Sequence, residues 1–503
     1  MNIVIIGSGT AGVTLAKRLL NFSEKAHVTI IEVGDTIEQL NQRIWVDYVS
    51  DPKKNDPYSD YKELPDDQVN LEESVDLDLP GSRYFGLGGS TNVWGGWCIR
   101  YKQEDFFLNS NTGYGADWPY DLSTLEPFYR KAEETLWVAG NSKPNPPIPY
   151  TLKDGEVISA LESLGLKYEP LPLARKESCL TIGTCKYCPI GKRYAPFFDL
   201  RELQLSYPDR LNIVSMSFAT RLKMKGKSKC SAVEIINHSS GETSSIECDQ
   251  VVIAAGAIES PKLLLASSNS EWPTGIGNKY GHLGKHLTAH PLVQVVGVRS
   301  GNPDNYEQPV DFPTLACRAY DDESHQKTGK LFFVRDGRGN ATNIENEWLD
   351  GHSLQSIQRV MRGRIPFELR GFVEVFSHPD NYIELDSAKS SFGGYKTKVS
   401  FQKSKETLKA IQDAETKMSK ILEEMNCKSI LPKTRTSIRA DHATSTCRMS
   451  KKESDGVVDE NLCVHGTENI FVCSNAVLPN GAAVNPTLTL VAVTEKLAVH
   501  LCT

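Results

Sequence analysis

The segment that most constrains the fold of this chain is NIVIIGSGTAGVTLAKRLL, close to its beginning. Residues 2–6 form an apolar run typical of a short buried strand, and residues 13–20 carry apolar side chains at helical spacing. Gly7, Gly9 and Gly12 stand between them. A strand, glycines at this spacing and a helix in direct succession are typical of the start of a dinucleotide-binding β-α-β unit.

The next apolar run, residues 27–32, ends on Glu32, where such units carry an acid that accepts hydrogen bonds from ribose hydroxyls. Gly7 permits a tight turn, and Gly9 lets the backbone approach a pyrophosphate. Gly12 lets the helix pack closely, so that its N-terminal N–H groups face the phosphates. A glycine-rich turn in some other α/β fold is the alternative interpretation.

Charge and composition exclude several classes of partner. The chain has 503 residues with a net charge of −7, which gives no reason to expect a nucleic acid or an anionic membrane as partner. No apolar run approaches the ~18 residues needed to span a bilayer. The first apolar run lacks the basic leader and cleavage site of a signal peptide, and twelve cysteines suit a reducing compartment. We expect a cytoplasmic protein without nucleic-acid or membrane partners.

A second glycine-rich stretch, GSRYFGLGGSTNVWGGWCIR, covers residues 81–100. Such a density of glycine indicates backbone that lies against something flat or bulky. A bare multi-turn loop is the alternative.

Periodicity places further elements along the chain. Residues 121–139 have an amphipathic helical pattern, with Asp121 or Ser123 near the start. Residues 249–266 predict a buried strand, a turn of small residues and a helix that begins near Ser260–Pro261.

The hydrophobic pattern changes after His290–Pro291. Alternating patterns predict strands of an antiparallel sheet, and a charged helix follows at 403–426. The predicted strands are 371–377, 381–386 and 396–402. The last part again has the pattern of an α/β fold, at 469–479 and 485–501.

Four segments together resemble the glucose–methanol–choline (GMC) family of FAD-dependent oxidoreductases. They are GSGTAG with Glu32, LGGSTNVWGG (87–96), AAGAIESPKLLLAS (254–267) and the tail from DHATSTCRM to NPTLTL. The resemblance implies an α/β FAD-binding Rossmann-like domain, made of residues 1–120, 200–290 and 435–503. It is interleaved with an α+β substrate domain on an antiparallel sheet, made of residues 121–199 and 291–434.

The resemblance also implies which residues contact FAD. Ser90, Trp94, Gly95 and Trp97 would lie beside the flavin, Ala219 would offer backbone to the adenine, and Arg83 would meet the pyrophosphate. Ser474 and Asn475 stand at the family's small polar pair near the ribityl chain. Some relatives carry a histidine in the LGGST loop that bonds to the flavin, whereas this chain has Asn92-Val93-Trp94. Non-covalent FAD is therefore expected.

By the same resemblance His442 would be the catalytic base, with Asn485 as its partner. Histidine is neutral near pH 7 and can take the hydroxyl proton of an alcohol while a hydride leaves for flavin N5. For His442 the alternatives are a core histidine bonded to the backbone and a metal ligand, although no second ligand stands at suitable spacing. We predict no metal at this site.

Asn485 can donate and accept hydrogen bonds, so it can orient the same hydroxyl. Asn485-Pro486-Thr487 is also a good helix start, with asparagine as N-cap and proline in the first position. The two readings are compatible, because the N–H groups of such a helix, from Thr487 onward, would point at the flavin C2 carbonyl and N1.

Residues 179–194 contain Cys179, Cys185 and Cys188, the last followed by proline. This spacing leaves open an iron–sulfur loop, as in some sugar dehydrogenases of the family, and a plain thiol-bearing loop. A cluster would direct electrons to a protein partner, and its absence would leave oxygen or another acceptor.

The tail, with Cys447-Arg448-Met449 and the His/Asn pair, is similar to that of bacterial pyranose- and glycoside-oxidising members of the family. The resemblance thus implies an FAD-dependent oxidoreductase that acts on the alcohol group of a sugar, glycoside or polyol. Oxidation of a non-sugar alcohol, a lyase of the same fold that uses FAD structurally, and a flavin-binding protein without catalysis remain as alternatives.

Overall fold

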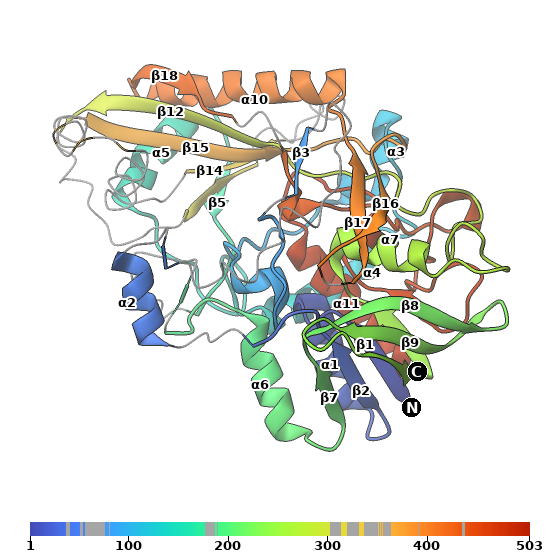
Figure 1. Cartoon of the computed structure of the whole chain (residues 1–503). Coiled ribbons are helices and arrows are strands. Elements are labelled where there is room, and N and C mark those ends of the chain that lie inside the picture. Colours follow the sequence, from blue (N-terminus) through green and yellow to red (C-terminus); the bar gives the residue numbers. More distant parts are fainter. Residues whose placement is uncertain are drawn as a thin grey trace.

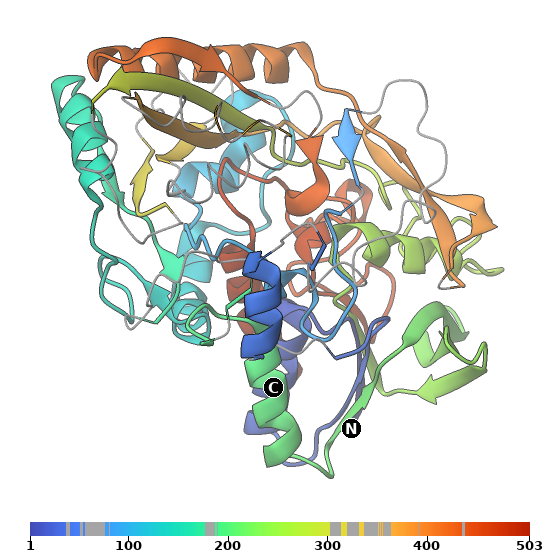
Figure 2. The same cartoon turned by 60° about the vertical axis from the view of Figure 1, so that its left-hand side comes forward.

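A computed structural model of the chain is organised around two β-sheets, one at the lower right and one at the top of Figure 1. Figure 2 keeps the same separation after rotation. The structure describes residues 1–36, 41–50, 54–55, 76–79, 81–176, 187–188, 190–301, 313–318, 331–335, 351, 353, 355, 364–391, 393–434 and 438–502.

The first sheet has five parallel strands, in the order β20-β11-β1-β2-β7. They are β20 (Ile470–Val472), β11 (Gln250–Ile253), β1 (Asn2–Ile6), β2 (His27–Ile31) and β7 (Leu211–Val214). Most of their aliphatic side chains are buried, as a parallel sheet covered on both faces requires, and only Ile213 and Val214 of β7 are partly exposed. The predicted strands at 2–6 and 27–32 and the α/β fold class are confirmed.

Helix α1 (Thr10–Phe22) follows β1 through a turn that only glycine can make. Gly7 has φ +104°, and a Cβ on it would lie 2.6 Å from the Ala254 carbonyl oxygen. A Cβ on Gly12 would lie 2.1 Å from the Gly7 carbonyl oxygen. The close packing of helix on strand therefore depends on both glycines.

Helix α7 (Gly256–Ala266) begins earlier than predicted. The sequence placed its start near Ser260–Pro261, but Pro261 lies inside the helix. Proline cannot donate to the carbonyl four residues back, on Ala257. The Thr446 hydroxyl donates to that oxygen instead, at 2.6 Å. A side chain from the distant C-terminal segment thus satisfies the group that proline leaves open.

The second sheet has six antiparallel strands, in the order β18-β12-β15-β14-β13-β5. They are β18 (Lys428–Pro432), β12 (Leu292–Ser300), β15 (Arg364–Val373), β14 (Leu331–Arg335), β13 (Leu315–Cys317) and β5 (Tyr168–Pro170). Helices α10 (Lys405–Glu424) and α5 (Leu152–Ser163) pack together, and α10 lies along β12 and β15 (Figure 1). The antiparallel sheet and the helix at 403–426 are confirmed.

Two details of that prediction are wrong. The strand predicted at 371–377 is β15, which ends at Val373. The other two, β16 (Tyr382–Lys389) and β17 (Tyr395–Ser400), pair only with each other. Their hairpin packs on α7 and against a three-stranded sheet. That sheet contains β8 (Ser217–Lys225), β9 (Lys229–Asn237) and β10 (Thr243–Glu247).

Helices α4 (Leu122–Thr135) and α11 (Thr487–Cys502) pack against each other. Of the two residues expected near the start of α4, Asp121 is the cap, since its carboxylate accepts from the Thr124 N–H. Among the described residues, no helix has both the length and the apolar character needed to cross a membrane. The other elements are α2 (Gln42–Ser50), α3 (Leu108–Thr112), α6 (Pro196–Ser206), β3 (Leu77–Asp78), β19 (Ile438–Arg439), β4 (Val138–Ala139) and β6 (Leu173–Ala174).

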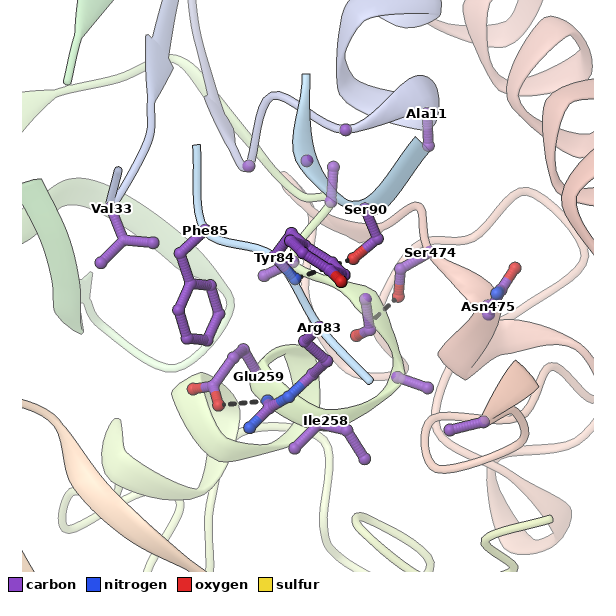
Figure 3. Close-up of a pocket in the computed structure, with 18 of the residues that line it drawn as sticks. Ala11, Val33, Arg83, Tyr84, Phe85, Ser90, Ile258, Glu259, Ser474 and Asn475 are labelled. Atoms are coloured by element: carbon purple, nitrogen blue, oxygen red, sulfur yellow. Dashed lines mark hydrogen bonds and ion pairs between the residues drawn. The ribbon is translucent and has the colours of Figure 1, made fainter. Parts of the chain in front are cut away.

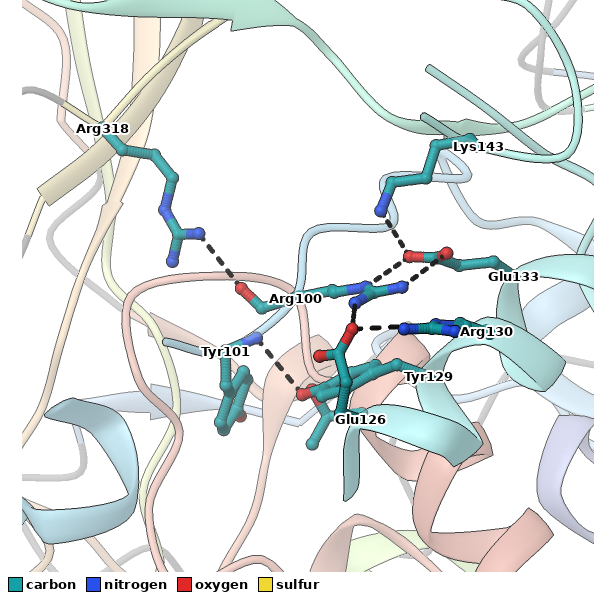
Figure 4. A network of polar contacts seen from close by, with 9 residues as sticks. Arg100, Tyr101, Glu126, Tyr129, Arg130, Glu133, Lys143 and Arg318 are labelled. Carbon is teal, nitrogen blue, oxygen red and sulfur yellow. Dashed lines mark hydrogen bonds and ion pairs between the residues drawn. The ribbon is translucent and has the colours of Figure 1, made fainter. Parts of the chain in front are cut away.

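A partly buried ion cluster ties α4 to Arg100, at the end of the second glycine-rich stretch (Figure 4). The Glu133 side chain is 3% exposed. It accepts from Arg100 Nε and Nη2 at 2.6 and 2.8 Å, and from Lys143 Nζ at 2.5 Å. Arg100 also donates to Glu126 at 2.7 Å.

Replacing Glu133 with alanine should lower the free energy of unfolding by about 3 kcal/mol, because it leaves two partly buried cations facing each other. Urea unfolding followed by tryptophan fluorescence measures the loss. The matched control is Glu126→Ala, which removes a carboxylate that is 37% exposed and should cost below about 1 kcal/mol. Equal losses in the two variants would contradict a dominant role for Glu133.

Candidate active site

A cavity of about 780 Å³ is lined by segments far apart in the sequence. This volume lies in the upper part of the ~300–1,000 Å³ range of small-molecule sites. The lining comes from the Gly7–Ala11 turn, the end of β2, residues 82–96, the start of β8, the start of α7, the β16–β17 hairpin, residues 439–443, Ser474 and Asn475, and the start of α11. Figure 3 shows part of this lining.

At one part of the cavity lie the predicted dinucleotide-binding residues Gly7, Gly9 and Glu32. A Cβ on Gly9 would meet no atom within 4 Å, so the backbone there faces open space. Glu32 Oε2 accepts from the Ser8 N–H at 2.9 Å and from its hydroxyl at 2.6 Å. Burial raises the pKa of this carboxyl group, although the hydrogen bonds from Ser8 act in the opposite direction.

The second glycine-rich stretch forms another wall, where Ser90, Trp94 and Gly95 line the cavity. Trp94 Nε1 donates to the Tyr194 carbonyl at 2.9 Å, and the Arg193 guanidinium donates to the Trp94 carbonyl at 2.6 Å. These bonds hold the loop from behind.

Trp97, predicted beside the flavin, and Gly12 are not among the lining residues. The Trp97 indole lies directly behind Gly95, because a Cβ on Gly95 would be 3.2 Å from Trp97 Nε1. Its ring also packs against Phe372 at 5.7 Å between centroids.

Arg83, predicted to meet the pyrophosphate, lines the cavity but is already in an ion pair (Figure 3). Its Nη1 donates to Glu259 Oε1 at 2.7 Å, and Lys262 Nζ donates to the same oxygen at 2.8 Å. Burial alone would raise the pKa of Glu259, but Lys262 and Arg83 hold it below its ordinary value. Two cations thus share one carboxylate at this wall.

The remaining predicted positions line the cavity as well: Ala219, Ser474, Asn475 and Thr487. The Ser474 hydroxyl donates to the Gly256 carbonyl at 3.2 Å. Asn475 Oδ1 and Asn485 Oδ1 are buried and have no hydrogen-bond partner within the described part of the chain. Buried amide oxygens are normally satisfied, so both suit a bound molecule that donates to them. The open space at Gly9 and these two oxygens fit a dinucleotide cofactor.

His442 and Asn485 come together at the cavity. Asn485 Nδ2 donates to His442 Nε2 at 3.0 Å. His442 Nδ1 lies 3.0 Å from His290 Nδ1, and the Phe372 ring packs edge-on to His442 at 4.8 Å between centroids. The two residues predicted as base and partner are therefore in direct contact. Helix α11 begins at Thr487, one residue later than the predicted start at Pro486.

Burial lowers the pKa of His442 well below its ordinary value; His290, when it is protonated, and Arg439 act in the same direction. The imidazole is consequently neutral at neutral pH, and a neutral imidazole is the state that accepts a proton.

The alternative interpretations of His442 and of the cysteine-containing segment can be compared with the structure. Among the described residues, the partners of the two His442 ring nitrogens are side chains and not the backbone that a core histidine would use. In the described ranges, no group of three or more His, Cys, Asp or Glu side chains could hold a metal ion. Cys179 and Cys185 lie outside the described residues, so the iron–sulfur hypothesis stays untested there; Cys188 is half-buried.

Sequence reasoning missed His290, Phe372, Glu259 and Lys262. His290 directly precedes Pro291, where the hydrophobic pattern of the sequence changes. That position was the signal that could have identified it. Glu259 and Lys262 are three apart on one helix, which is the spacing of a side-chain pair. No pattern in the sequence joins Phe372 to the site.

Two family models, both described as GMC oxidoreductase, match residues 3–292 and 377–494. The large subunit of fructose dehydrogenase from Gluconobacter japonicus is 23% identical over 99% of this chain and 97% of that protein. 6'''-hydroxyparomomycin C oxidase from Streptomyces lividus is 24% identical over 82% of this chain and 79% of that protein.

The crystal structure of pyridoxine 4-oxidase from Mesorbium loti superposes with a TM-score of 0.69 at 17% identity, over 99% of this chain and 98% of that one. This likeness establishes the shared fold. The models together cover most of the chain, and the fold and the glycine-lined cavity agree with them. The chain therefore belongs to the GMC oxidoreductases, a family of FAD-binding flavoproteins that act on CH–OH groups as oxidases or dehydrogenases.

Proposed function

We propose that this enzyme oxidises an alcohol group on a sugar, glycoside or other polyol, with His442 as the base and with non-covalent FAD. The observation that carries the proposal is the contact of His442 Nε2 with Asn485 in a cavity whose other walls suit a dinucleotide. A neutral imidazole held at a fixed place on the cavity wall can take the proton of a substrate hydroxyl.

In this proposal each wall of the cavity binds a different part of FAD. Gly7, Gly9 and the start of α1 hold the pyrophosphate, Glu32 binds the ribose, and the backbone at Ala219 meets the adenine. The other contacts are distributed among Arg83, Ser90, Trp94, Gly95, Ser474, Asn475 and Thr487. Val93 lines the cavity where some relatives carry the linking histidine, and its side chain has no nucleophile, which supports a non-covalent cofactor.

When bound, FAD would supply the two-electron acceptor for the hydrogen that leaves the carbinol carbon. The side chains of this protein handle the proton. His442 Nε2 is occupied by the Asn485 amide N–H, so a substrate hydroxyl must displace that donor or share the nitrogen with it. Asn485 Oδ1 has no partner in the described structure and could then accept from another hydroxyl of a polyol.

The sugar class is supported by the fructose-linked relative and by the pairing of a histidine with an asparagine, a donor and acceptor suited to hydroxyl-rich substrates. The final electron acceptor is oxygen or another oxidant, and either would return the cofactor to its oxidised state.

Anaerobic mixing of the yellow holoenzyme with a panel of sugars, glycosides and simple alcohols tests the proposal. We expect a sugar or polyol to bleach the flavin absorbance while a carbonyl product appears in equal amount. Bleaching by simple alcohols alone would refute the substrate class. An unbleached flavin with carbonyl release would indicate a lyase, and neither response would indicate a non-catalytic flavin protein.

A further inference from the structure

His290 and His442 face each other because of a short antiparallel pairing. Thr288 and Thr444 exchange two backbone hydrogen bonds, of 3.3 and 2.9 Å. Moving two residues from that pair along each segment, in opposite chain directions, gives His290 and His442, the last residue of a short 3-10 turn (Ala440–His442). Their ring nitrogens are 3.0 Å apart.

The far side of His290 determines where its proton resides. His290 Nε2 lies 2.9 Å from the Ala482 carbonyl oxygen and 3.1 Å from the Gly481 carbonyl oxygen. Carbonyl oxygens only accept, so Nε2 must carry a proton and donate it. His290 is 4% exposed, and burial lowers its pKa to about 4, despite the opposing effect of the two carbonyl groups. The ring is neutral at neutral pH, so Nδ1 carries a lone pair.

That lone pair fixes the state of His442. Two unprotonated nitrogens 3.0 Å apart would repel, so His442 Nδ1 must carry the proton and donate to His290 Nδ1. In a neutral imidazole this places the lone pair on Nε2. The Asn485 amide N–H donates to that same nitrogen, which agrees with the assignment.

We propose that His290 is a positioning residue that holds His442 in the tautomer with an unprotonated Nε2 at the cavity. It also stabilises the protonated form of His442 after Nε2 has taken a proton. This inference rests on the proposed role of His442 as the base. When Nε2 takes a proton, the positive ring can still donate from Nδ1 to the neutral His290. The hydrogen bond between the two histidines thus persists when His442 accepts a proton, while the Asn485 N–H loses its acceptor and must give way.

The surroundings contain few groups that could do this instead. Phe372 packs on both rings, at 4.8 and 5.6 Å between centroids. Arg439 faces His442 and is paired with Asp441 at 3.0 Å. The Tyr101 hydroxyl donates to the Gly481 carbonyl at 2.8 Å, and Glu374 adjoins Tyr101. Within the described structure, the hydrogen-bond partner of His442 Nδ1 is His290.

The test compares His290→Leu with His290→Asn in the FAD-loaded enzyme. Asparagine can place an oxygen near the position of Nδ1, whereas leucine cannot accept a hydrogen bond. With a substrate that bleaches the wild type, His290→Leu should slow anaerobic flavin reduction by about 10- to 100-fold, and His290→Asn should recover most of that rate.

The pH profile separates positioning from a structural role. Without an acceptor for Nδ1–H, the protonated form of His442 is less stable, so the apparent pKa of flavin reduction should fall in His290→Leu. The matched control is His286→Leu, which removes another buried histidine, paired with His282 at 3.1 Å outside the cavity lining. It should leave the profile unchanged.

A second variant reaches the same ring from the opposite side. A Cβ on Gly481 would lie 2.9 Å from His290 Nε2. Gly481→Ala should therefore displace the His290 ring and disturb its hydrogen bond with His442 without altering either histidine, and it should slow reduction and lower the apparent pKa. If His290→Leu fails to retain FAD, Gly481→Ala is the variant that tests the positioning role of His290.

Long-range ¹H–¹⁵N spectra of histidine-labelled holoenzyme report the tautomers without any substrate. The signals of His442, assigned by their loss in His442→Ala, should show a protonated Nδ1 in the wild type and a shift toward protonated Nε2 in His290→Leu. This readout stands even if no alcohol bleaches the flavin, which would refute the proposed function alone. A wild type with protonated Nε2 would overturn the inference. So would equal slowing in both His290 variants with an unchanged pH profile.

Discussion

Replacing His442 with alanine should leave the protein folded and yellow but slow anaerobic flavin reduction by about 10²–10⁴-fold. That range corresponds to about 3–5 kcal/mol of lost transition-state stabilisation. The reason is chemical, because His442 Nε2 is the basic atom held at the cavity wall and its pKa is low enough to keep it neutral. Stopped-flow measurement of flavin bleaching at saturating substrate gives the rate constant.

Two controls separate loss of the base from loss of the site. FAD content per chain should match the wild type, since no predicted cofactor-holding role belongs to His442. His442→Gln should be as slow as the alanine variant, because an amide fills the space and can hydrogen-bond but cannot take up a proton. A glutamine variant with the wild-type rate would show that orientation, and not proton transfer, is what this position supplies.

The fold near the N-terminus was predictable because local sequence determines it. Gly7 is required by its positive φ, and Gly12 by the Gly7 carbonyl oxygen five residues back, so their spacing carries the information. The same holds for Asp121, whose capping bond spans three residues.

Long-range contacts explain what sequence reasoning missed. Helix α7 continues through Pro261 because a hydroxyl on Thr446 satisfies the Ala257 carbonyl, and no local pattern announces that partner. The hairpin of β16 and β17 has the alternation of the neighbouring sheet, yet it packs elsewhere, since period-2 patterning fixes a strand and not its sheet.

The residues of the site likewise include some that local sequence could predict and some that depend on long-range contacts. His442 and Asn485 could be proposed from the resemblance, because each stands in a recognisable segment. His290 could not, because its role depends on the pairing of Thr288 with Thr444 and on two carbonyl oxygens from residues 481 and 482. Arg83 lines the cavity as expected, but its ion pair with Glu259 arises from a helix 176 residues away.

Gly9 should be the position at which a single side chain removes the cofactor without unfolding the protein. Its backbone, at φ −65° and ψ −178°, is open to any residue, and a Cβ there meets nothing within 4 Å. A leucine side chain would instead project into the space that the pyrophosphate needs. We expect Gly9→Leu to purify colourless, with FAD affinity reduced at least about a hundredfold, or ~3 kcal/mol.

The neighbouring glycine supplies the contrast that makes this result interpretable. Gly12→Ala forces a Cβ to within 2.1 Å of the Gly7 carbonyl oxygen, so it should disturb the strand–helix packing and lower the unfolding midpoint of the apoprotein. Gly9→Leu should keep that midpoint, and Gly9→Ala should lie between wild type and leucine in FAD content. Absorbance at the flavin band per chain and urea unfolding of the apoproteins give the two quantities. If Gly9→Leu retained one FAD per chain, the cofactor could not lie along this turn, and the assignment of the whole cavity would have to change.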